Sequence, residues 1–251
     1  LKGCEIVIVT AGANQRPGET RIDLLGRNVK IFESIIPQIA KAAPETTLLI
    51  TANPADIMTE VALKLSGFPK ERVIGSGTVL DTSRFRTLLG YYLGISPQSI
   101  HANVLGEHGD SEVLVWSASD AGTVSLDKIA QDMGKPFTAE VKAQIDDGVR
   151  NAAYKIIDGK GATFYGIAGA LCRICSAITN NEYAILTVSS HHDDVEGVKG
   201  VCLSLPTVLG KRGVHKVIYP SLDAAESKAL HDSAEVMKEY SDQALALIAA
   251  K

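Results

Sequence analysis

The sequence has little of what marks several large classes of protein. Its four cysteines are too few, and too unevenly spaced, to form the disulfide framework of a secreted protein in a chain of 251 residues. It has no run rich in lysine and arginine, and its net charge is −4, which argues against nucleic-acid and membrane-surface partners. No apolar run approaches the roughly 18 residues of a membrane span, and no segment is typical of a signal peptide. We therefore expect a cytoplasmic protein without membrane or nucleic-acid partners.

The chain also lacks an initial methionine. It opens with Leu1-Lys2-Gly3-Cys4 and continues directly into an apolar strand, so we expect that residues precede Leu1 in the whole protein. An internal repeat and a low-complexity segment are absent as well. With 45% apolar residues, the chain can bury a substantial core, as one large domain or two small ones.

The first part of the chain alternates strand and helix patterns. The run Glu5–Thr10 is apolar and β-branched, as in a strand buried on both faces of a parallel sheet. A helical stripe follows, with Pro37 inside it, where we expect a kink. Asp56 is expected to cap the next helix. This alternation predicts right-handed crossovers and a parallel sheet, with strands at 5–10, 47–51 and 72–75 and helices at 25–43, 56–65 and 81–93.

Beyond about His101 the rhythm changes to a mixed α+β pattern. Asp223 and Glu226 have the spacing of a capping box at the start of the last helix. His191-His192-Asp193-Asp194 is expected to form a solvated turn, and Cys172-x-x-Cys175 to be a pair of buried helix thiols, so no metal site is predicted. The expected elements are strands at 100–105, 113–116, 183–189, 201–205 and 214–218, helices at 138–157, 163–179 and from 223, and a linker at 158–161.

The stretch Gly106-Glu107-His108-Gly109-Asp110-Ser111 is the strongest candidate for chemistry. Histidine has an unperturbed pKa of about 6.5, so it can give or take a proton near neutrality. The flanking glycines suggest a turn that brings the ring close to a ligand. The alternative interpretation of these residues is a histidine in a polar surface turn.

Three further polar positions each follow a predicted parallel strand. The loop Gln15–Arg21 follows the first strand, Asn53 follows the second, and Asp81 and Arg84 lie beyond the third. Ligands of open α/β sheets bind in the crevice at the carboxyl ends of the strands. These residues and His108 therefore form a plausible set of two guanidiniums, an amide, a carboxylate and an imidazole.

These motifs, in this order, resemble the L-lactate/malate dehydrogenase family, most closely its bacterial-type L-lactate dehydrogenases, over nearly the whole chain. The matching stretches are Thr10-Ala11-Gly12-Ala13, Gln15-Arg16-Pro17-Gly18-Glu19-Thr20-Arg21, Asn53-Pro54-Ala55-Asp56, Gly75-Ser76-Gly77-Thr78, Leu80-Asp81-Thr82-Ser83-Arg84-Phe85-Arg86 and Gly106-Glu107-His108-Gly109-Asp110. The resemblance implies an NAD-dependent enzyme that interconverts pyruvate and L-lactate; malate or another 2-hydroxy acid is the alternative substrate.

The resemblance also implies catalytic roles. Arg84 would hold the substrate carboxylate in a two-pronged pair, which a planar guanidinium does better than an ammonium. His108 would protonate the ketone oxygen, and Asp81 would pair with the other ring nitrogen, although Asp81 could also be a helix N-cap. Arg21, on a loop over the site, would stabilise charge on the same oxygen. Asn53 would donate to the substrate oxygen or face the nicotinamide, or be only a turn residue.

Substrate and cofactor residues follow from the same resemblance. Gln15 would face the variable end of the substrate; being neutral, it favours a monocarboxylate such as pyruvate, with Arg16 next to it as a possible exception. Thr163 would touch the substrate. The residues that would line NAD are Gly12, Ala13, Ser34, Thr51, Asn53 and Ser76.

Arg86 and His101 match the positions at which bacterial lactate dehydrogenases bind fructose 1,6-bisphosphate at a subunit interface. The resemblance thus makes this sugar bisphosphate a possible effector, and it implies a homotetramer that acts in glycolysis. Non-allosteric members carry the same pair, so activation stays open.

The chain departs from the family at its start. The family begins with a strand and the G-x-G-x-x-G turn that binds the pyrophosphate, and this sequence has neither. We therefore expect the C-terminal half of a Rossmann-type parallel sheet at 1–75, as a partial dinucleotide-binding domain, and an α+β substrate domain at 76–251. The alternative is a non-catalytic fragment that binds partner subunits, because half of the cofactor site is missing.

Overall fold

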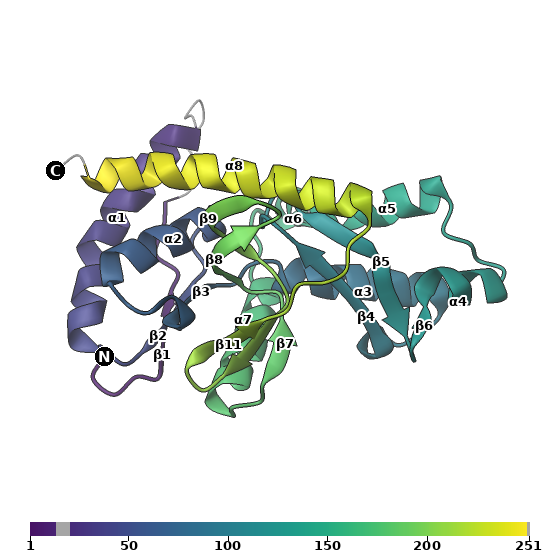
Figure 1. The fold of residues 1–251 in the computed structure, drawn as a ribbon, viewed down its shortest axis with the longest axis horizontal. Coiled ribbons are helices and arrows are strands. Elements are labelled where there is room, and N and C mark those ends of the chain that lie inside the picture. Colours follow the sequence, from purple (N-terminus) through teal and green to yellow (C-terminus); the bar gives the residue numbers. More distant parts are fainter. Residues whose placement is uncertain (14–20, 250–251) are drawn as a thin grey trace.

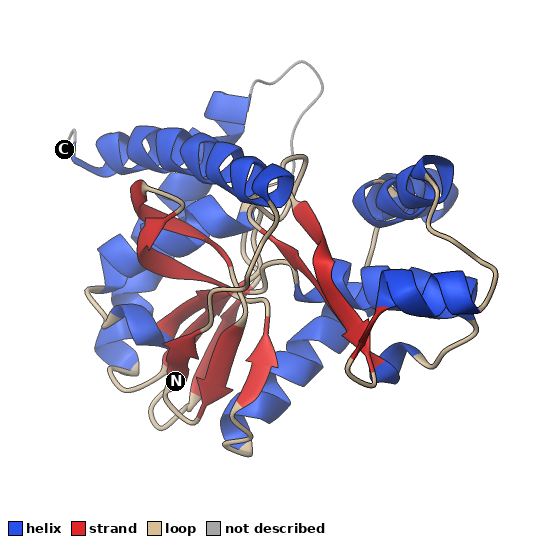
Figure 2. Ribbon diagram, turned by 45° about the vertical axis from the view of Figure 1, so that its right-hand side comes forward, coloured by secondary structure: helices blue, strands red, loops and turns tan. Residues whose placement is uncertain are grey.

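A five-stranded sheet forms the centre of the computed structural model, which describes residues 1–13 and 21–249 (Figures 1 and 2). The strand order is β1-β2-β3-β8-β9. The first three strands are parallel, because a helix carries the chain back after β1 and again after β2, whereas β8 and β9 run antiparallel to their neighbours. The bounds are β1 (Ile6–Val9), β2 (Thr47–Ile50), β3 (Val73–Gly75), β8 (Ser189–Val195) and β9 (Val198–Ser204).

Three helices cover one face of this sheet: α1 (Arg21–Ala42), α2 (Ala55–Ser66) and α8 (Ala224–Ala249). The long helix α8, yellow in Figure 1, packs on β9, α1, α2 and β5. Phe32 and Ile36 of α1 and Met58 of α2 are completely buried between the helices and the sheet. Burying side chains of this size stabilises the fold by about 1.5–3 kcal/mol each.

Two smaller antiparallel sheets complete the fold. The first packs against α3 and α5 around the buried Phe85, and α7 fills the space between the central sheet and the second. The sheets consist of β4 (Ile100–Leu105), β5 (Val113–Ala121) and β6 (Val124–Ser125), and of β7 (Ala184–Leu186), β10 (Thr207–Gly210) and β11 (Gly213–Val217). The helices are α3 (Val79–Leu93), α4 (Leu126–Asp132), α5 (Ala139–Arg150), α6 (Ala152–Lys160) and α7 (Tyr165–Thr179), with short 3-10 helices at Lys70–Arg72 and Pro97–Ser99.

The predicted fold class is confirmed: parallel strands come first and a mixed α+β part follows. The capping box is confirmed too, since Asp223 Oδ1 accepts hydrogen bonds from the N–H groups of Ala225 and Glu226. The boundary at residue 75 stays a prediction; the central sheet takes β8 and β9 from beyond it. Among the described residues, no helix is long and apolar enough to cross a membrane.

The predicted helix at 138–157 and the linker at 158–161 are wrong in detail. The helix breaks at Asn151 into α5 and α6, and α6 continues to Lys160. It ends at Gly161, whose φ of 81° is a left-handed conformation that glycine adopts without strain. The linker is therefore mostly helical.

The expected solvated turn at His191–Asp194 is also wrong, because these residues lie inside β8. His192 is only 3% exposed, its Nε2 lies 3.1 Å from the carbonyl oxygen of Leu203, and burial lowers its pKa to about 4. The strand predicted at 183–189 is divided between β7 and β8, which belong to different sheets. Burial of both thiols on α7 is wrong as well, since Cys172 is exposed and Cys175 half-buried.

Candidate active site

The loop at residues 106–111 leaves β4 through a glycine that no other residue could replace without strain. Gly106 has a φ of 82°, and its N–H and carbonyl pair with the backbone of Ser204 in β9 at 2.9 Å each. A Cβ atom at Gly106 would lie 2.7 Å from the Oγ of Ser233 in α8. The close approach of β9 and α8 thus requires glycine at this position.

Side chains from two helices hold the loop in place. The N–H of Glu107 donates to Ser233 Oγ at 2.9 Å, and the N–H of His108 donates to Asp56 Oδ2 of α2 at 2.8 Å. Within the loop, Glu107 Oε2 accepts hydrogen bonds from the N–H and the hydroxyl of Ser111. The position of the imidazole is therefore set by α2 and α8 as well as by the loop itself.

Asp56 is the clearest correction to the sequence prediction at this site. It does not cap α2, which begins at Ala55 after Pro54; it is 1% exposed and faces the loop. Burial raises the pKa of Asp56 to about 6, although the N–H of His108 and the hydroxyl of Ser189 lower it. The sequence feature that could have linked Asp56 to the site is its place in Asn53-Pro54-Ala55-Asp56, at the end of a parallel strand.

His108, Asp81 and Arg84 form one connected group. His108 Nδ1 lies 2.6 Å from Asp81 Oδ2, and Arg84 Nη1 donates to Asp81 Oδ1 at 2.9 Å. Asp81 lies in the first turn of α3, whose N-cap is Thr78, so the alternative role of Asp81 as an N-cap is wrong. The bond through Nδ1 leaves Nε2 as the ring nitrogen available to a ligand.

The charges of this group shift its titration. Burial alone would raise the pKa of Asp81, but His108 and Arg84 lower it below the ordinary 3.8. Burial alone would lower the pKa of His108, but the charge and hydrogen bond of Asp81, with smaller effects of Asp56 and Glu112, raise it to about 9. The structure therefore stabilises an imidazolium at neutral pH.

A cavity of about 260 Å³ opens above this group. The predicted residues Asn53, Asp81, Arg84 and His108 all line it. Glu107 and Asp110 of the 106–111 loop line it as well, and the sequence analysis missed four further polar residues, which are Glu112, Arg150, Tyr154 and Tyr240. Glu112 directly follows the motif that ends at Ser111 and could have been grouped with it, whereas the other three lie far along the chain, and only the packing of α5, α6 and α8 brings them to the cavity.

Thr163 lines a neighbouring cavity of about 410 Å³, between α6 and α7, that shares Arg84 with the first one. The guanidinium of Arg84 therefore connects the two spaces. Gln15 lies outside the described residues. Arg21 begins α1, and its side chain is not among the described parts of the chain.

Residues at the ends of the parallel strands lie close to one another. Ala13 donates its N–H to Asn28 Oδ1 at 2.7 Å, and Asn28 Nδ2 donates to the carbonyl oxygen of Asn53 at 2.8 Å. A Cβ atom at Gly12 would lie 3.1 Å from the Cβ of Ala52. Asn28 is fully buried and joins the loops after β1 and β2, a role that the sequence analysis missed because it lies within a predicted helix.

The other predicted cofactor residues are more scattered. Thr51 and Ser76 directly follow β2 and β3, and the hydroxyl of Thr51 donates to the carbonyl oxygen of Val9. Ser34 is exposed on α1, where its hydroxyl donates to the carbonyl oxygen of Ile31. Ser34 is thus not brought to the cavity wall.

Arg86 and His101 lie on neighbouring elements. Arg86 of α3 donates to the carbonyl oxygen of Ala102 at 2.8 Å and to Asn103 Oδ1 at 3.2 Å, and His101 is exposed next to these residues on β4. Arg86 lines a separate hollow of about 390 Å³ that also includes Arg173.

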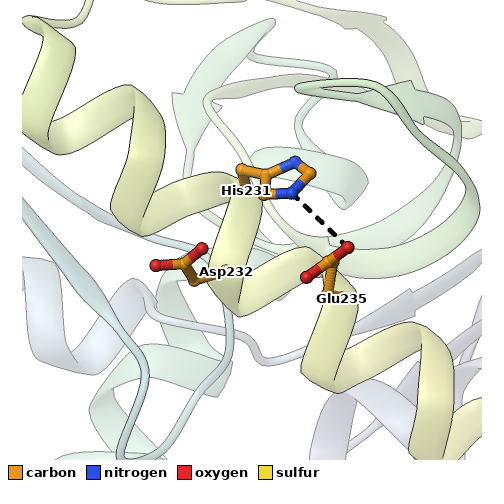
Figure 3. A group of neighbouring side chains, drawn as sticks. All are labelled: His231, Asp232 and Glu235. Carbon is orange, nitrogen blue, oxygen red and sulfur yellow. Dashed lines mark ion pairs between the residues drawn. The ribbon is translucent and has the colours of Figure 1, made fainter.

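One group among the described residues could offer three metal ligands: His231, Asp232 and Glu235 on α8 (Figure 3). His231 Nε2 lies 3.5 Å from Glu235 Oε1, whereas Asp232 projects in another direction and accepts a hydrogen bond from Lys228. These contacts are the i, i+4 ion pairs of an exposed helix, and we assign no metal to them.

The two parts of the chain each match a known protein family. Residues 1–75 match the family described as the NAD-binding domain of lactate/malate dehydrogenases, and residues 78–248 match their α/β C-terminal domain. The chain is 55% identical to the L-lactate dehydrogenase of Thermus aquaticus over 238 residues, which covers 95% of this chain and 77% of that protein. It is 52% identical to the L-lactate dehydrogenase of Allorhizobium ampelinum over 237 residues, or 94% and 76% of the two chains.

Solved structures agree with the sequence matches. A lactate dehydrogenase from a Medee basin deep-sea metagenome library superimposes with a TM-score of 0.93 at 40% identity, covering 97% of this chain and 77% of the other. The minor L-lactate dehydrogenase of Enterococcus mundtii, in a ligand-bound form, gives a TM-score of 0.91 at 36% identity, with 96% and 76% covered.

Proposed function

Because the chain belongs to the lactate/malate dehydrogenase family, we propose that it is an NAD-dependent L-lactate dehydrogenase, which interconverts pyruvate and L-lactate. The observation that carries the proposal is the common cavity of Arg84 and His108. A small keto acid needs a cation for its carboxylate and a proton donor for its ketone oxygen, and this cavity offers both within the reach of one small molecule.

The residues at the carboxyl ends of β1, β2 and β3 fit the cofactor. The backbone of Gly12 and the amide of Asn53 are exposed at this edge, where nucleotides bind to open α/β sheets. Bound NAD supplies the hydride chemistry through its nicotinamide ring. We assign its binding to Gly12, Ala13, Thr51, Asn53 and Ser76; Ser34 stays a prediction.

Arg84 binds the substrate carboxylate in this proposal. One of its guanidinium nitrogens is held by Asp81, which fixes the plane of the group. The side chain is only 17% exposed, so an ion pair formed there is weakly screened by solvent. Arg84 lines one cavity together with the proposed proton donor and a second cavity together with Thr163, which supports our assignment of Thr163 to the substrate as well.

His108 moves the proton. During reduction the imidazolium donates its Nε2 proton to the ketone oxygen, which becomes the hydroxyl of lactate; during oxidation the neutral ring takes that proton back. Asp81 holds Nδ1–H throughout and keeps its negative charge, which stabilises the imidazolium. The pair is thus ready for the proton-donating direction at neutral pH.

Gln15 and Arg21 complete the proposal from the sequence. Arg21 stabilises negative charge on the ketone oxygen. Gln15 is neutral and selects a monocarboxylate, since an unpaired second carboxylate would lose several kcal/mol on burial. A malate or other 2-hydroxy acid dehydrogenase is the alternative, with oxaloacetate as the competing substrate.

We also propose a cytoplasmic homotetramer that acts in glycolysis, for which fructose 1,6-bisphosphate is the candidate effector. The adjacency of Arg86 and the exposed His101 supports an anion site on the surface next to β4.

Arg84→Lys tests the function. It keeps the charge but loses the planar fork, so KM for pyruvate should rise by about 10- to 100-fold while stability changes by less than about 1 kcal/mol. Steady-state NADH oxidation and thermal melting measure the two effects. Arg212→Lys, at an exposed arginine between β10 and β11, is the matched control and should leave KM unchanged. An unchanged KM in Arg84→Lys would contradict the carboxylate role, and a wild-type preference for oxaloacetate would favour the alternative substrate.

A further inference from the structure

Glu112 is a buried acid in the wall of the cavity that the proposed reaction does not use. It directly precedes β5, is 4% exposed and lines the same cavity as His108 and Arg84. Its Oε1 is buried and has no hydrogen-bond partner among the residues that the structure describes. A buried carboxylate in this situation is costly unless a cation compensates it.

The cations near Glu112 are already engaged. Arg150 of α5 forms a two-pronged pair with Asp146, at 2.6 and 3.2 Å, and also donates to the carbonyl oxygen of Asp110. Arg84 and His108 both bind Asp81. None of these three cations makes a hydrogen bond to Glu112 in the described part of the chain.

The charges that face Glu112 come from α3, α5 and the 106–111 loop. Burial raises the pKa of Glu112 most, and Asp81 and Asp146 raise it further, whereas Arg150 and His108 lower it; the result is about 8. The acid form is therefore the main form of Glu112 at neutral pH.

We propose that Glu112 controls the binding of the anionic substrate through its own charge: it carries a proton in the working site, and loss of that proton repels the substrate. The inference rests on the proposed function only for the identity of the anion. The protonated state of Glu112 is independent of it.

The balance of charges around the cavity explains why this proton matters. The described cations that line it are Arg84, His108 and Arg150, and the described carboxylates besides Glu112 are Asp81, Glu107 and Asp110. Ionisation of Glu112 adds one negative charge to this wall. That charge opposes an arriving carboxylate in a region of low solvent screening, whereas protonated Glu112 does not.

It follows that two protons must be in place for an anion to bind, one on His108 and one on Glu112. Because the two groups influence each other, they titrate as a pair. Above the pKa values of both groups, each further pH unit should lower the affinity for the anion by a factor that approaches one hundred. A site that needs only one proton loses a factor of ten per pH unit.

Oxamate, an unreactive isostere of pyruvate, is the probe for the first experiment. Its dissociation constant is measured with the full chain and NADH from pH 6 to 10.5, for the wild type, for Glu112→Gln and for the exposed control Glu45→Gln. At high pH the affinity for oxamate should fall by nearly a hundredfold per pH unit in the wild type and in Glu45→Gln. In Glu112→Gln it should fall by about tenfold per pH unit. Glu112→Gln with the wild-type slope would overturn the proposal.

The second experiment needs no ligand. The infrared difference spectrum between the wild type and Glu112→Gln at pH 7.5 should contain the carbonyl band of a protonated carboxylic acid, and the wild type should lose this band as the pH rises through about 8. Asp56 titrates lower, near pH 6, and is mostly ionised at the start of this range. Absence of the band would overturn the proposal even if pyruvate is turned over. Its presence in a chain without pyruvate activity would contradict only the proposed function.

Discussion

At the scale of residues, the site depends on the sharing of one carboxylate by two cations. Asp81 is 3% exposed and contacts both His108 and Arg84, so its charge both raises the pKa of the imidazole and orients the guanidinium. The same residue thus links proton transfer to substrate binding. A change at Asp81 should therefore be visible in the pH dependence as well as in the rate.

Asp81→Asn should shift the alkaline limb of kcat/KM for pyruvate to lower pH. In the wild type kcat/KM should begin to fall near pH 8, where Glu112 loses its proton, and should fall more steeply as the pH rises through about 9, because reduction also needs the imidazolium. Without the charge of Asp81, burial dominates and the pKa of His108 should fall by about 1–3 units. Steady-state rates from pH 5.5 to 10 measure the shift, and Asp232→Asn on α8 is the exposed control. A limb that stays at its wild-type position in Asp81→Asn would remove Asp81 from this role.

The same shift affects stability. The pKa of folded His108 lies above its ordinary 6.5, so the imidazolium contributes stability that is fully present below about pH 6.5. This contribution is lost as the pH rises towards about 9. Asp81→Asn should therefore destabilise the protein more at pH 6 than at pH 9.5.

At the scale of elements, helix α8 connects the end of the chain to the site. Ser233 is fully buried on α8, accepts the N–H of Glu107 and lies 3.0 Å from the hydroxyl of Ser111. The 106–111 loop is thus held from a helix more than a hundred residues away, whereas the sequence pattern indicated only that α8 is a capped helix.

Ser233→Ala should destabilise the fold by about 1–3 kcal/mol, because it leaves the buried N–H of Glu107 without its partner. A small displacement of His108 should also lower kcat/KM by about ten- to hundredfold. Ser241→Ala is a control on the same helix, since the buried hydroxyl of Ser241 has no partner among the described residues, and its removal should be neutral or stabilising. Chemical denaturation and steady-state kinetics measure both variants; equal effects in the two would contradict the anchoring role.

At the scale of the whole molecule, large apolar side chains remain exposed around α6 and the start of α7. Tyr154, Phe164 and Tyr165 are 62%, 59% and 83% exposed, and Ile157 is 46% exposed. Clustered apolar surface of this kind is typical of subunit interfaces. It supports the proposed homotetramer, in which such a surface would be covered.

Tyr165→Ser should weaken self-association. Sedimentation velocity of the wild type should show a tetramer of 26.6 kDa chains, and the variant should shift towards smaller species at the same concentration. Tyr91→Ser, at the 79% exposed Tyr91 of α3, is the control for loss of an exposed tyrosine and should stay tetrameric. A wild-type monomer at micromolar concentration would contradict the proposed tetramer. A second sedimentation run with fructose 1,6-bisphosphate added tests whether this effector changes the assembly.

Local pattern alone was enough to predict the parallel strands, most helix positions and the capping box at Asp223, because periodicity and capping act within a few residues. The motifs also indicated which residues to group: Asn53, Asp81, Arg84 and His108 do line one cavity. The pattern failed where long-range pairing overrides it, as for His191–Asp194, which looks like a polar turn but pairs with β9 inside the sheet.

What the tertiary structure alone decided is the environment of each group. The sequence determined that a histidine lies between two glycines after a strand, and that carboxylates and guanidiniums are available elsewhere. Only packing decided that Asp56 supports the backbone of His108, that Ser233 holds the loop, and that Glu112 is buried beside an arginine already paired with Asp146. The physical reason is that burial and charge pairing depend on distances in space between segments far apart in the chain, and these quantities set the pKa values on which the chemistry rests.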